Sequence, residues 1–470
     1  MIEIPFRVAG LTDSEQASLN ALLAQWGSKR LRNDVRALFY EMKSSQDALM
    51  SSTVPEVVRR RKFVLGWSAI AVDKLNRRCN LDGFYSPDGT DLDSLGLDGL
   101  VESNRLIGEL SRAGAASLVH AVSFLVRFRG DTSKGEPPVV VVAKSARHAT
   151  GIWDNRRRSL TSFLSIDDYD RSTNRPSQMT MFLPNLNIEM RREDGAWKVL
   201  RSPHRDGVPV NVLPYKPQLD RPFGSSRITR AVMSLHSQAL AAMIRADVNG
   251  EAYSLPRYVL LGATESSFTN ADGTVKPAWR AAWDAVWMMG DDPDLADDKN
   301  PLARADVKQF TGQSPEPQNA HLRMLAQMFS GETGIPIGEL GIIGDSNPTS
   351  EGAQTVSRDD IVSEAEQTTD VWSPEIAECV TGALRMLNND PAVPKVKPIW
   401  RNPQHVSRAS AADAGLKTVQ ALPWIAETEV GMEMMGFSRS QIERALADRR
   451  RARAAETLAG LRAAAGGIGD

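Results

Sequence analysis

The sequence predicts an α+β protein in which helices come first, an antiparallel sheet follows and long helices complete the chain. Three observations indicate this fold class. Apolar residues recur at steps of three and four over much of residues 12–120, as on one face of a helix. Short alternating apolar stretches then continue to residue 201, with the turn pair Asp194-Gly195 between the last two. Beyond residue 221, helical spacing returns in long segments.

The composition is that of a soluble globular chain with room for two to four domains. The 470 residues are 41% hydrophobic and 24% charged, and the formal net charge is −2. We find no run of eighteen apolar residues and no basic, apolar leader, so we expect neither a membrane span nor a secretion signal. Cys79 and Cys379 lie far apart, which favours buried free thiols in a reducing compartment.

The net charge also bears on nucleic-acid binding. A protein that grips duplex DNA through many phosphates needs an excess of Lys and Arg, whereas this chain has 56 basic and 58 acidic residues. The balance argues against a tight DNA binder. A nearly neutral charge is compatible with a protein that lets DNA slide past it.

The first 90 residues are predicted to be mainly helical. Thr12-x-x-Glu15 is a capping box that begins the first helix, and a second helical run is expected from Lys29 to Met42. The basic stretch Arg59–Lys62 is either a phosphate contact or a solvated or intersubunit face, and we favour the second interpretation. A further helix is expected to end at a turn, Asp82-Gly83.

Another helical block is predicted from residue 92 to 120, and its Gly114-Ala115-Ala116 indicates a close contact with another helix. Alternating or apolar stretches after it predict strands, and the Asp194-Gly195 turn makes a hairpin of the last two. The predicted strands are 121–128, 139–142, 179–183, 187–192 and 197–201.

The stretch from Ser226 to Asn249 predicts the helix around which the chain is organised, about 36 Å long at 1.5 Å per residue. Ser225 and Ser226 are its expected N-cap, and Asn249-Gly250 is its expected stop. Its main apolar face is expected to carry Ile228, Val232, Leu235, Ala239, Ala242 and Ala246, and a second, weaker face Leu240, Ile244 and Val248.

A small island follows, with predicted strands at 257–261 and about 306–310 and a helix from Pro277 to Met289. The tryptophans of that helix recur every four residues; they suit a stacking platform for nucleic acid or, as we favour, a buried core or partner interface. An acidic loop after them lacks the spacing of a calcium-binding loop, so we expect a solvated or DNA-repelling segment. The residues are Trp279, Trp283 and Trp287, then Asp291 and Asp292.

The chain from Pro317 onward is again predicted to be helical. A helix from Pro317 to Gly331 is expected to return antiparallel to the central helix, and the Gly-, Asn- and Pro-rich segment 341–352 is expected to be an exposed flexible loop. A long helix follows, with a kink or a fresh start at Pro374. The remaining predicted segments are the helix 353–387, a proline-rich linker over 391–403, and helices at 409–422 and 438–461.

The segment from Arg221 to Gly262, a capped long helix running into an apolar strand and a glycine, resembles the central segment of the portal proteins of tailed double-stranded-DNA phages. TGIPIGELG at 333–341 followed by NPTSEGA at 347–353 is similar to the second signature of that family. The resemblance covers nearly the whole chain. It implies a wing (1–220), a stem helix (221–256), a clip (257–313), a second stem helix (314–340), a tunnel loop (341–352), a kinked wing helix and linker (353–403), and a helical crown (404–470).

The family resemblance further implies a homo-oligomeric ring, usually of twelve subunits, at one vertex of the capsid. DNA would be packaged and ejected through the ring, which would contact the major capsid protein, the terminase motor and the head-tail connector proteins. It would be assembled in the host cytoplasm and reside in the virion, with no membrane partner. The clip, with Trp279, Trp283, Trp287, Asp291 and Asp292, would dock partners, and the tunnel loop would lie nearest the DNA through Gly344, Asp345, Ser346, Asn347, Pro348, Thr349 and Ser350.

The sequence contains no phosphate-binding Gly-x-x-x-x-Gly-Lys-Ser/Thr, no His-Glu-x-x-His and no Gly-x-Ser-x-Gly. We therefore expect no catalytic residue, no metal and no cofactor. Two alternatives stay open. One is a phage-encoded, metal-dependent enzyme acting on nucleic acid through Asp167, Asp168 and Asp170, which a nuclease assay of Asp168→Ala would test. The other is a monomeric adaptor that binds one partner through the tryptophans, which light scattering would test.

Overall fold

The computed structural model describes residues 6–44, 54, 56–170, 175–253, 257–261, 274, 306–310, 314–342, 358–404 and 408–466. Over these residues the chain combines helices with antiparallel strands, as the sequence predicts. It divides into two compact units: Met1–Arg30 with Lys74–Ser226 and Val362–Asp470, and Leu31–Asp73 with Arg227–Ile361. None of the helices in these described ranges is long and apolar enough to cross a lipid bilayer.

Two antiparallel sheets lie at the centre of the first unit, a five-stranded sheet in the order β4-β5-β6-β7-β8 and a three-stranded sheet in the order β3-β2-β9. The predicted strands are confirmed as β2, β3, β6, β7 and β8, and Asp194-Gly195 joins β7 to β8 with both residues at positive φ. Strands β4, β5 and β9 were not predicted. The bounds are β2 (Val122–Arg129), β3 (Val139–Ser145), β4 (Ala149–Asp154), β5 (Ser159–Asp170), β6 (Arg175–Leu183), β7 (Leu186–Glu193), β8 (Ala196–Pro203) and β9 (Val210–Pro214).

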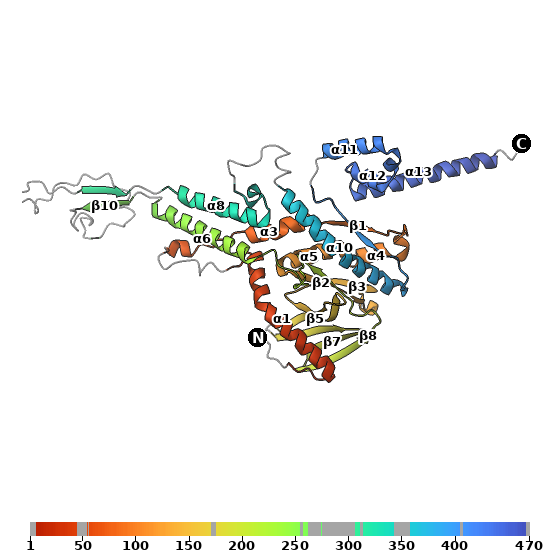
Figure 1. Cartoon of the computed structure of the whole chain (residues 1–470), viewed down its shortest axis with the longest axis horizontal. Helices are drawn as coiled ribbons and strands as arrows, with labels where there is room; N and C mark the ends of the chain where they lie inside the picture. Colours follow the sequence, from red (N-terminus) through yellow and green to blue (C-terminus); the bar gives the residue numbers. More distant parts are fainter. Residues whose placement is uncertain are drawn as a thin grey trace, which may run out of the picture. The chain divides into compact units, whose positions relative to one another are not determined.

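Facing side chains of the two sheets form one core, in which the rings of Phe124 and Phe163 lie 4.9 Å apart. The other face of the five-stranded sheet is covered by the first part of α1 (Asp13–Tyr40), through residues such as Leu22 and Trp26 (Figure 1). The capping box at Thr12 is confirmed, because its amide donates to Glu15 Oε2 at 2.8 Å. Helix α1 is unbroken, so the prediction of two helices was wrong.

Helices α5 (Leu106–His120) and α10 (Asp359–Asn388) meet closely at Gly114, as predicted. A Cβ atom there would lie 3.0 Å from Cζ3 of Trp372. The predicted block from 92 to 120 is interrupted, because Arg105 adopts a positive φ of 49° between α4 (Leu97–Ser103) and α5. Pro374 lies inside the unbroken α10, so the alternative of a fresh helix start was wrong.

Two predictions made from the sequence were wrong, because the residues concerned form a pair of strands, β1 and β12. Asp82-Gly83, predicted as a turn, lies inside β1 (Leu81–Tyr85), and part of the predicted linker forms β12 (Lys397–Trp400). The two strands pair antiparallel, with an irregular register between Leu81 and Gly83. The glycine therefore marks a bulge, where one extra residue is accommodated in a strand.

The remaining elements are short helices and the C-terminal helices. Helices were predicted at 409–422 and 438–461, and α11 and α13 confirm them. The bounds are α2 (Glu56–Arg59), α3 (Trp67–Asn76), α11 (Arg408–Ala421), α12 (Glu429–Met434), α13 (Arg439–Gly466), and the 3₁₀ turns Asp93–Leu95, Thr132–Lys134, Ile337–Leu340 and Pro423–Glu427.

Candidate functional site: the paired helices α6 and α8

The second unit is built on two antiparallel helices, α6 (Arg230–Tyr253) and α8 (Glu316–Thr333), which lie side by side in Figure 1. Between them in sequence, β10 (Arg257–Leu261) pairs antiparallel with β11 (Asp306–Phe310). Both strands have the predicted limits. The return helix is also confirmed, since it was predicted from Pro317 to Gly331. The two helices and the strand pair together are called the arm below.

The ends of α6 differ from the prediction. Helix α6 begins at Arg230, because the Thr229 hydroxyl accepts a hydrogen bond from the Val232 amide at 3.1 Å. The Ser226 hydroxyl, expected to cap the helix, instead donates to the Val119 carbonyl at 2.6 Å. The helix continues through Gly250 to Tyr253. A glycine commonly ends a helix by adopting left-handed backbone, and Gly250 does not adopt it.

The predicted apolar faces of α6 are confirmed. On the main face Ile228, Val232, Leu235, Ala239 and Ala242 are buried, and Ala246 is half-buried. On the second face, Leu240 and Ile244 pack against Val58, with Val248 beside them. Helix α8 contributes Leu325, Ala326 and Phe329, all at most 1% exposed. The arm is therefore held to its unit by apolar burial along both helices.

Arg227 ties the start of α6 to the end of α8. Its side chain is 5% exposed, and its guanidinium donates to the Ala71 carbonyl at 2.6 Å and to the Thr333 carbonyl at 2.7 Å. Close by, the Thr229 hydroxyl donates to Glu332 Oε1 at 3.0 Å. This role of Arg227 was not predicted from the sequence. The signal in the sequence was that the cation Arg227 directly precedes Ile228, the first residue of the main apolar face.

His236 is a buried histidine on α6. Its Nδ1 lies 2.9 Å from the Ser68 hydroxyl, and its ring packs edge-on against Phe39, with centroids 5.2 Å apart. Desolvation lowers the pKa of His236 to about 4. The imidazole is therefore neutral near pH 7 and serves as a packed hydrogen-bonding group.

The basic stretch predicted at Arg59–Lys62 lies beside α6. Arg61 forms an ion pair with Asp247 at 2.6 Å and a second one with Glu251, which raises the pKa of the guanidinium. Arg60 pairs with Glu56. The carboxylates of Glu56, Asp247 and Glu251 thus lie among the four cationic side chains of residues 59–62. This arrangement agrees with the favoured interpretation of the stretch as a solvated or intersubunit face.

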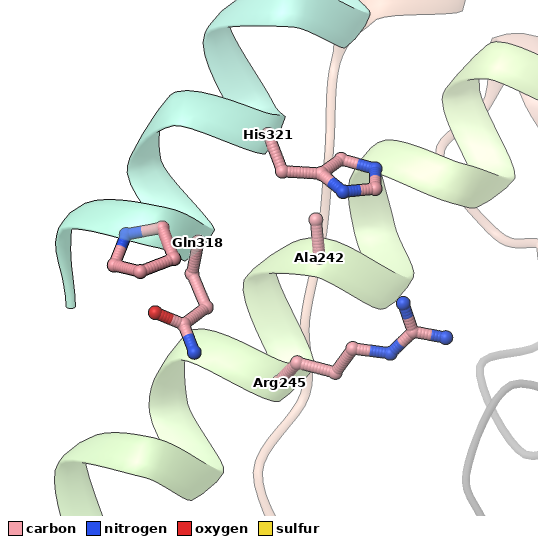
Figure 2. A pocket seen from close by; sticks show the side chains of 5 residues that line it. Ala242, Arg245, Gln318 and His321 are labelled. Carbon is pink, nitrogen blue, oxygen red and sulfur yellow. The ribbon is translucent and has the colours of Figure 1, made fainter. Parts of the chain in front are cut away.

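An open pocket of about 210 Å³ lies between the two helices. Figure 2 shows Ala242 of α6 pointing toward α8, which contributes Gln318 and His321, while the side chain of Arg245 on α6 extends away from Gln318. Pro317 completes the lining. A cation, an imidazole and an amide on a shallow surface suit contact with a polar or acidic group. They make no acid–base pair of the kind that catalysis needs.

The residues proposed from the sequence for DNA contact and partner docking lie outside the described residues. They are Gly344, Asp345, Ser346, Asn347, Pro348, Thr349 and Ser350 of the tunnel loop, and Trp279, Trp283, Trp287, Asp291 and Asp292 of the clip.

The acidic stretch of the enzymatic alternative lies on β5. The Asp167 carboxylate accepts hydrogen bonds from Lys144 Nζ at 2.8 Å and from the hydroxyls of Ser165 and Thr180, both at 2.6 Å. Asp168 accepts from the Tyr169 amide. No group of three or more His, Cys, Asp or Glu side chains suited to a metal ion occurs among the residues that the structure covers. Asp167 thus accepts hydrogen bonds from side chains of β3, β5 and β6.

Comparison with known proteins identifies homologues over most of the chain. The chain is 22% identical to a protein named "Portal protein" of Mycobacterium phage L5 over 389 residues, which are 81% of this chain and 77% of that protein. It is also 22% identical to the "Portal protein" of Mycobacterium phage D29 over 415 residues, covering 86% and 82% of the two chains. No protein-family model matches.

Solved structures give weaker likenesses. A chain from the neck of an empty GTA particle, computed with C6 symmetry, has a TM-score of 0.41 and 11% identity over 79% of this chain and 90% of its own. A chain from the neck of a native GTA particle, computed with C12 symmetry, has a TM-score of 0.42 and 12% identity over 79% and 91%.

Proposed function

We propose that this chain, a homologue of mycobacteriophage portal proteins, is the repeating subunit of a structural ring at one vertex of a phage capsid, through which double-stranded DNA is packaged and ejected. The observation that carries the proposal is similarity to two proteins with that name over more than four-fifths of the chain. The segments 221–262 and 333–353, which resemble portal proteins, fall within the region of similarity.

We propose that different segments of the chain have different roles in the ring. In the proposal α6 and α8, within 221–256 and 314–340, are the stem, and the β10–β11 pair, within 257–313, begins the clip. Residues 1–220 and 353–403 would form the wing with its linker, and 404–470 the crown. Residues 341–352 would form the tunnel loop. A ring of twelve copies of this subunit is proposed, closed by heterologous contacts between neighbours.

The charge balance favours a ring that passes DNA without holding it. Non-specific DNA binding at roughly 10⁻⁴ to 10⁻⁶ M comes from phosphate neutralisation by Lys and Arg. Cations repeated around a channel would retard translocation. We infer that the channel wall is neutral or acidic, with Asp345, Ser346 and Asn347 nearest the duplex. In the proposal the clip, through Trp279, Trp283 and Trp287, docks the terminase motor and later the head-tail connector proteins.

Electron microscopy of the purified protein tests the central proposal. We expect ring-shaped particles with a central hole, and labelled antibodies against the chain should mark one vertex of the virion. Light scattering should give a mass about twelve times that of the 51.5 kDa subunit. Single subunits in both the purified protein and the virion, or cleavage of DNA by the wild type that Asp168→Ala abolishes, would contradict the proposal.

A further inference from the structure

We propose that the outer edge of β8 receives an extended segment of a different virion protein, which adds to the five-stranded sheet as a sixth strand. The inference rests on the proposed place of the chain in a virion, and it names one surface through which the subunit binds a partner. Strand β8 is the last strand of its sheet, after β7 (Figure 1). The side of β8 that faces away from β7 is called its outer edge.

The hairpin between β7 and β8 fixes which backbone groups face the outer edge. Its two-residue turn has both residues at positive φ, and Glu193 lies opposite Ala196 on either side of the turn. The residues that flank such a turn exchange hydrogen bonds, and this kind of pair recurs at every second residue of an antiparallel ladder. The even-numbered residues of β8 therefore bond to β7. The residues whose amides and carbonyls face outward are Trp197, Val199 and Arg201.

The outer edge of β8 is open, unlike the other outer edges of the two central sheets. Side chains bond to the backbone at each of those edges: Asn104 and Glu109 at β3, Glu375 at β9 and Gln25 at β4. Within the described part of the chain, no hydrogen bond reaches the outward amides or carbonyls of β8. An open strand edge is a template for a further strand, and native proteins commonly close it.

Charged side chains can also protect an open edge, but those of β8 are bonded within the subunit. Lys198 pairs with Glu193 of β7 at 2.5 Å, and Arg201 pairs with Glu15 of α1 at 2.7 Å. Between them, Leu200 is 63% exposed on the face of the sheet that α1 does not cover. An exposed leucine beside free backbone groups favours an incoming strand with an apolar residue at that position.

The backbone chemistry of the edge selects a polypeptide as its occupant. The edge presents both N–H donors and C=O acceptors, and an added strand satisfies both with its own backbone. A DNA phosphate accepts hydrogen bonds but donates none, so the outward carbonyls would stay unbonded. An extended segment of about five residues, at about 3.4 Å per residue, is long enough to pair with residues 197–201.

A different protein fits this edge better than a second copy of the chain. Two β8 strands in antiparallel pairing make a two-fold contact, which closes a dimer and does not continue round a ring. A head-to-tail contact between these sheets needs a second open edge, whereas the outer edges of β3, β4 and β9 already carry bonds to side chains. The occupant is therefore a strand from outside the ring.

Hydrogen exchange with residue resolution tests the inference on the complete protein. In the purified ring, the amides of Val199 and Arg201 should exchange rapidly, whereas the amide of Leu200, which faces β7, should be protected. In virions the amides of Val199 and Arg201 should exchange roughly tenfold more slowly, or slower still. Leu200 serves as the internal control, because it should be protected in both samples. Equal exchange of Val199 and Arg201 in the purified ring and in virions would overturn the inference.

A pair of proline variants tests the direction of the backbone groups. Val199→Pro removes an outward amide, which an edge strand tolerates, so the purified protein should keep a Tm close to that of the wild type. In virions that contain this variant, Arg201 should lose its protection. Lys198→Pro is the matched control, because it removes an amide that faces β7 and should lower the Tm by several degrees. An equal loss of Tm in both variants would show that the outward register is wrong.

The outcomes separate this inference from the proposed function. If the wild type forms rings and lies at one vertex of the virion, but β8 exchanges equally in the purified ring and in virions, the inference is wrong and the proposed function stands. If the purified ring already protects Val199 and Arg201, a second copy occupies the edge and the inference is also wrong. Wild-type protein that forms no ring, even in virions, overturns both.

Discussion

Arg227 joins segments of the second unit that are far apart in sequence, because one buried guanidinium donates to the carbonyls of Ala71 and Thr333. Replacing it with alanine leaves both carbonyls without this donor. We expect Arg227→Ala to lower the free energy of unfolding by about 2–4 kcal/mol in urea denaturation. Arg230→Ala is the matched control, since Arg230 is exposed; it should change stability by less than about 0.5 kcal/mol. Equal effects of the two substitutions would contradict the structural role of Arg227.

His236 should make the protein sensitive to mild acid. Its folded-state pKa of about 4 lies below the value of about 6.5 for an exposed histidine, so the unfolded chain binds the proton first. The stability that this histidine contributes is therefore full above pH 6.5 and is lost as the pH falls toward 4. Between pH 7 and pH 5 we expect a loss of about 2 kcal/mol.

Urea denaturation at the two pH values checks this expectation. His236→Gln should lack the additional loss at pH 5 that the wild type shows, because glutamine does not titrate. His321→Gln, at an exposed position on α8, should behave as the wild type does. If His236→Gln loses as much stability as the wild type, proton uptake by this histidine is not the cause.

At the scale of elements, α10 packs against β2 and β9 at a crowded point. Arg127 on β2 is 7% exposed and bonds to Asn211, which also donates to Glu375 at 3.1 Å. Burial raises the pKa of Glu375 above its usual range. A Cβ atom on Gly382 would lie 2.7 Å from Cζ of Arg127. The glycine is thus required where the helix passes over the buried guanidinium.

Gly382→Ala should therefore destabilise the protein although alanine favours helix. Overpacking costs about 1–3 kcal/mol and helix propensity returns up to about 1 kcal/mol, so we expect a net loss of about 1–2 kcal/mol by urea denaturation. Gly99→Ala in α4 is the control, because nothing lies within 4 Å of a Cβ atom there. That variant should be as stable as the wild type or more stable. A stabilised Gly382→Ala variant would show that Arg127 moves aside at little cost.

The elements also show what the sequence allows to be predicted. The limits of β10 follow from a short apolar run, and Asp194-Gly195 locates its hairpin, because these signals are local. The β1–β12 pair was missed because its strands are more than 300 residues apart and carry a glycine and a proline, which locally favour turns. The role of Arg227 was missed for a related reason, since the carbonyls that it binds come from distant segments. The candidate DNA and docking residues stay predictions.

At the scale of the whole molecule, a net charge of −2 predicts weak retention of DNA. We expect the purified assembly to release linear duplex at 0.15 M salt in a filter-binding or sedimentation assay, with a shallow dependence of binding on salt. The double variant Asp345→Arg/Asn347→Arg should hold DNA more tightly if the tunnel loop lies beside the duplex. As a control, Asp413→Arg/Gln420→Arg adds the same amount of positive charge at exposed positions of α11. Equal retention by both variants would contradict the placement of the loop.

The antiparallel register of β10 and β11 sets Leu261 opposite Asp306. The 44 residues between them therefore leave and rejoin the arm at a single point. The entropy of closing such an excursion grows only slowly with its length, by about 0.6 kcal/mol for each doubling. We therefore expect insertions or deletions between Leu261 and Asp306 to leave α6 and α8 undisturbed. If the clip docks partners as proposed, related phages would be able to change their tail or motor through this insert while the rest of the subunit stays the same.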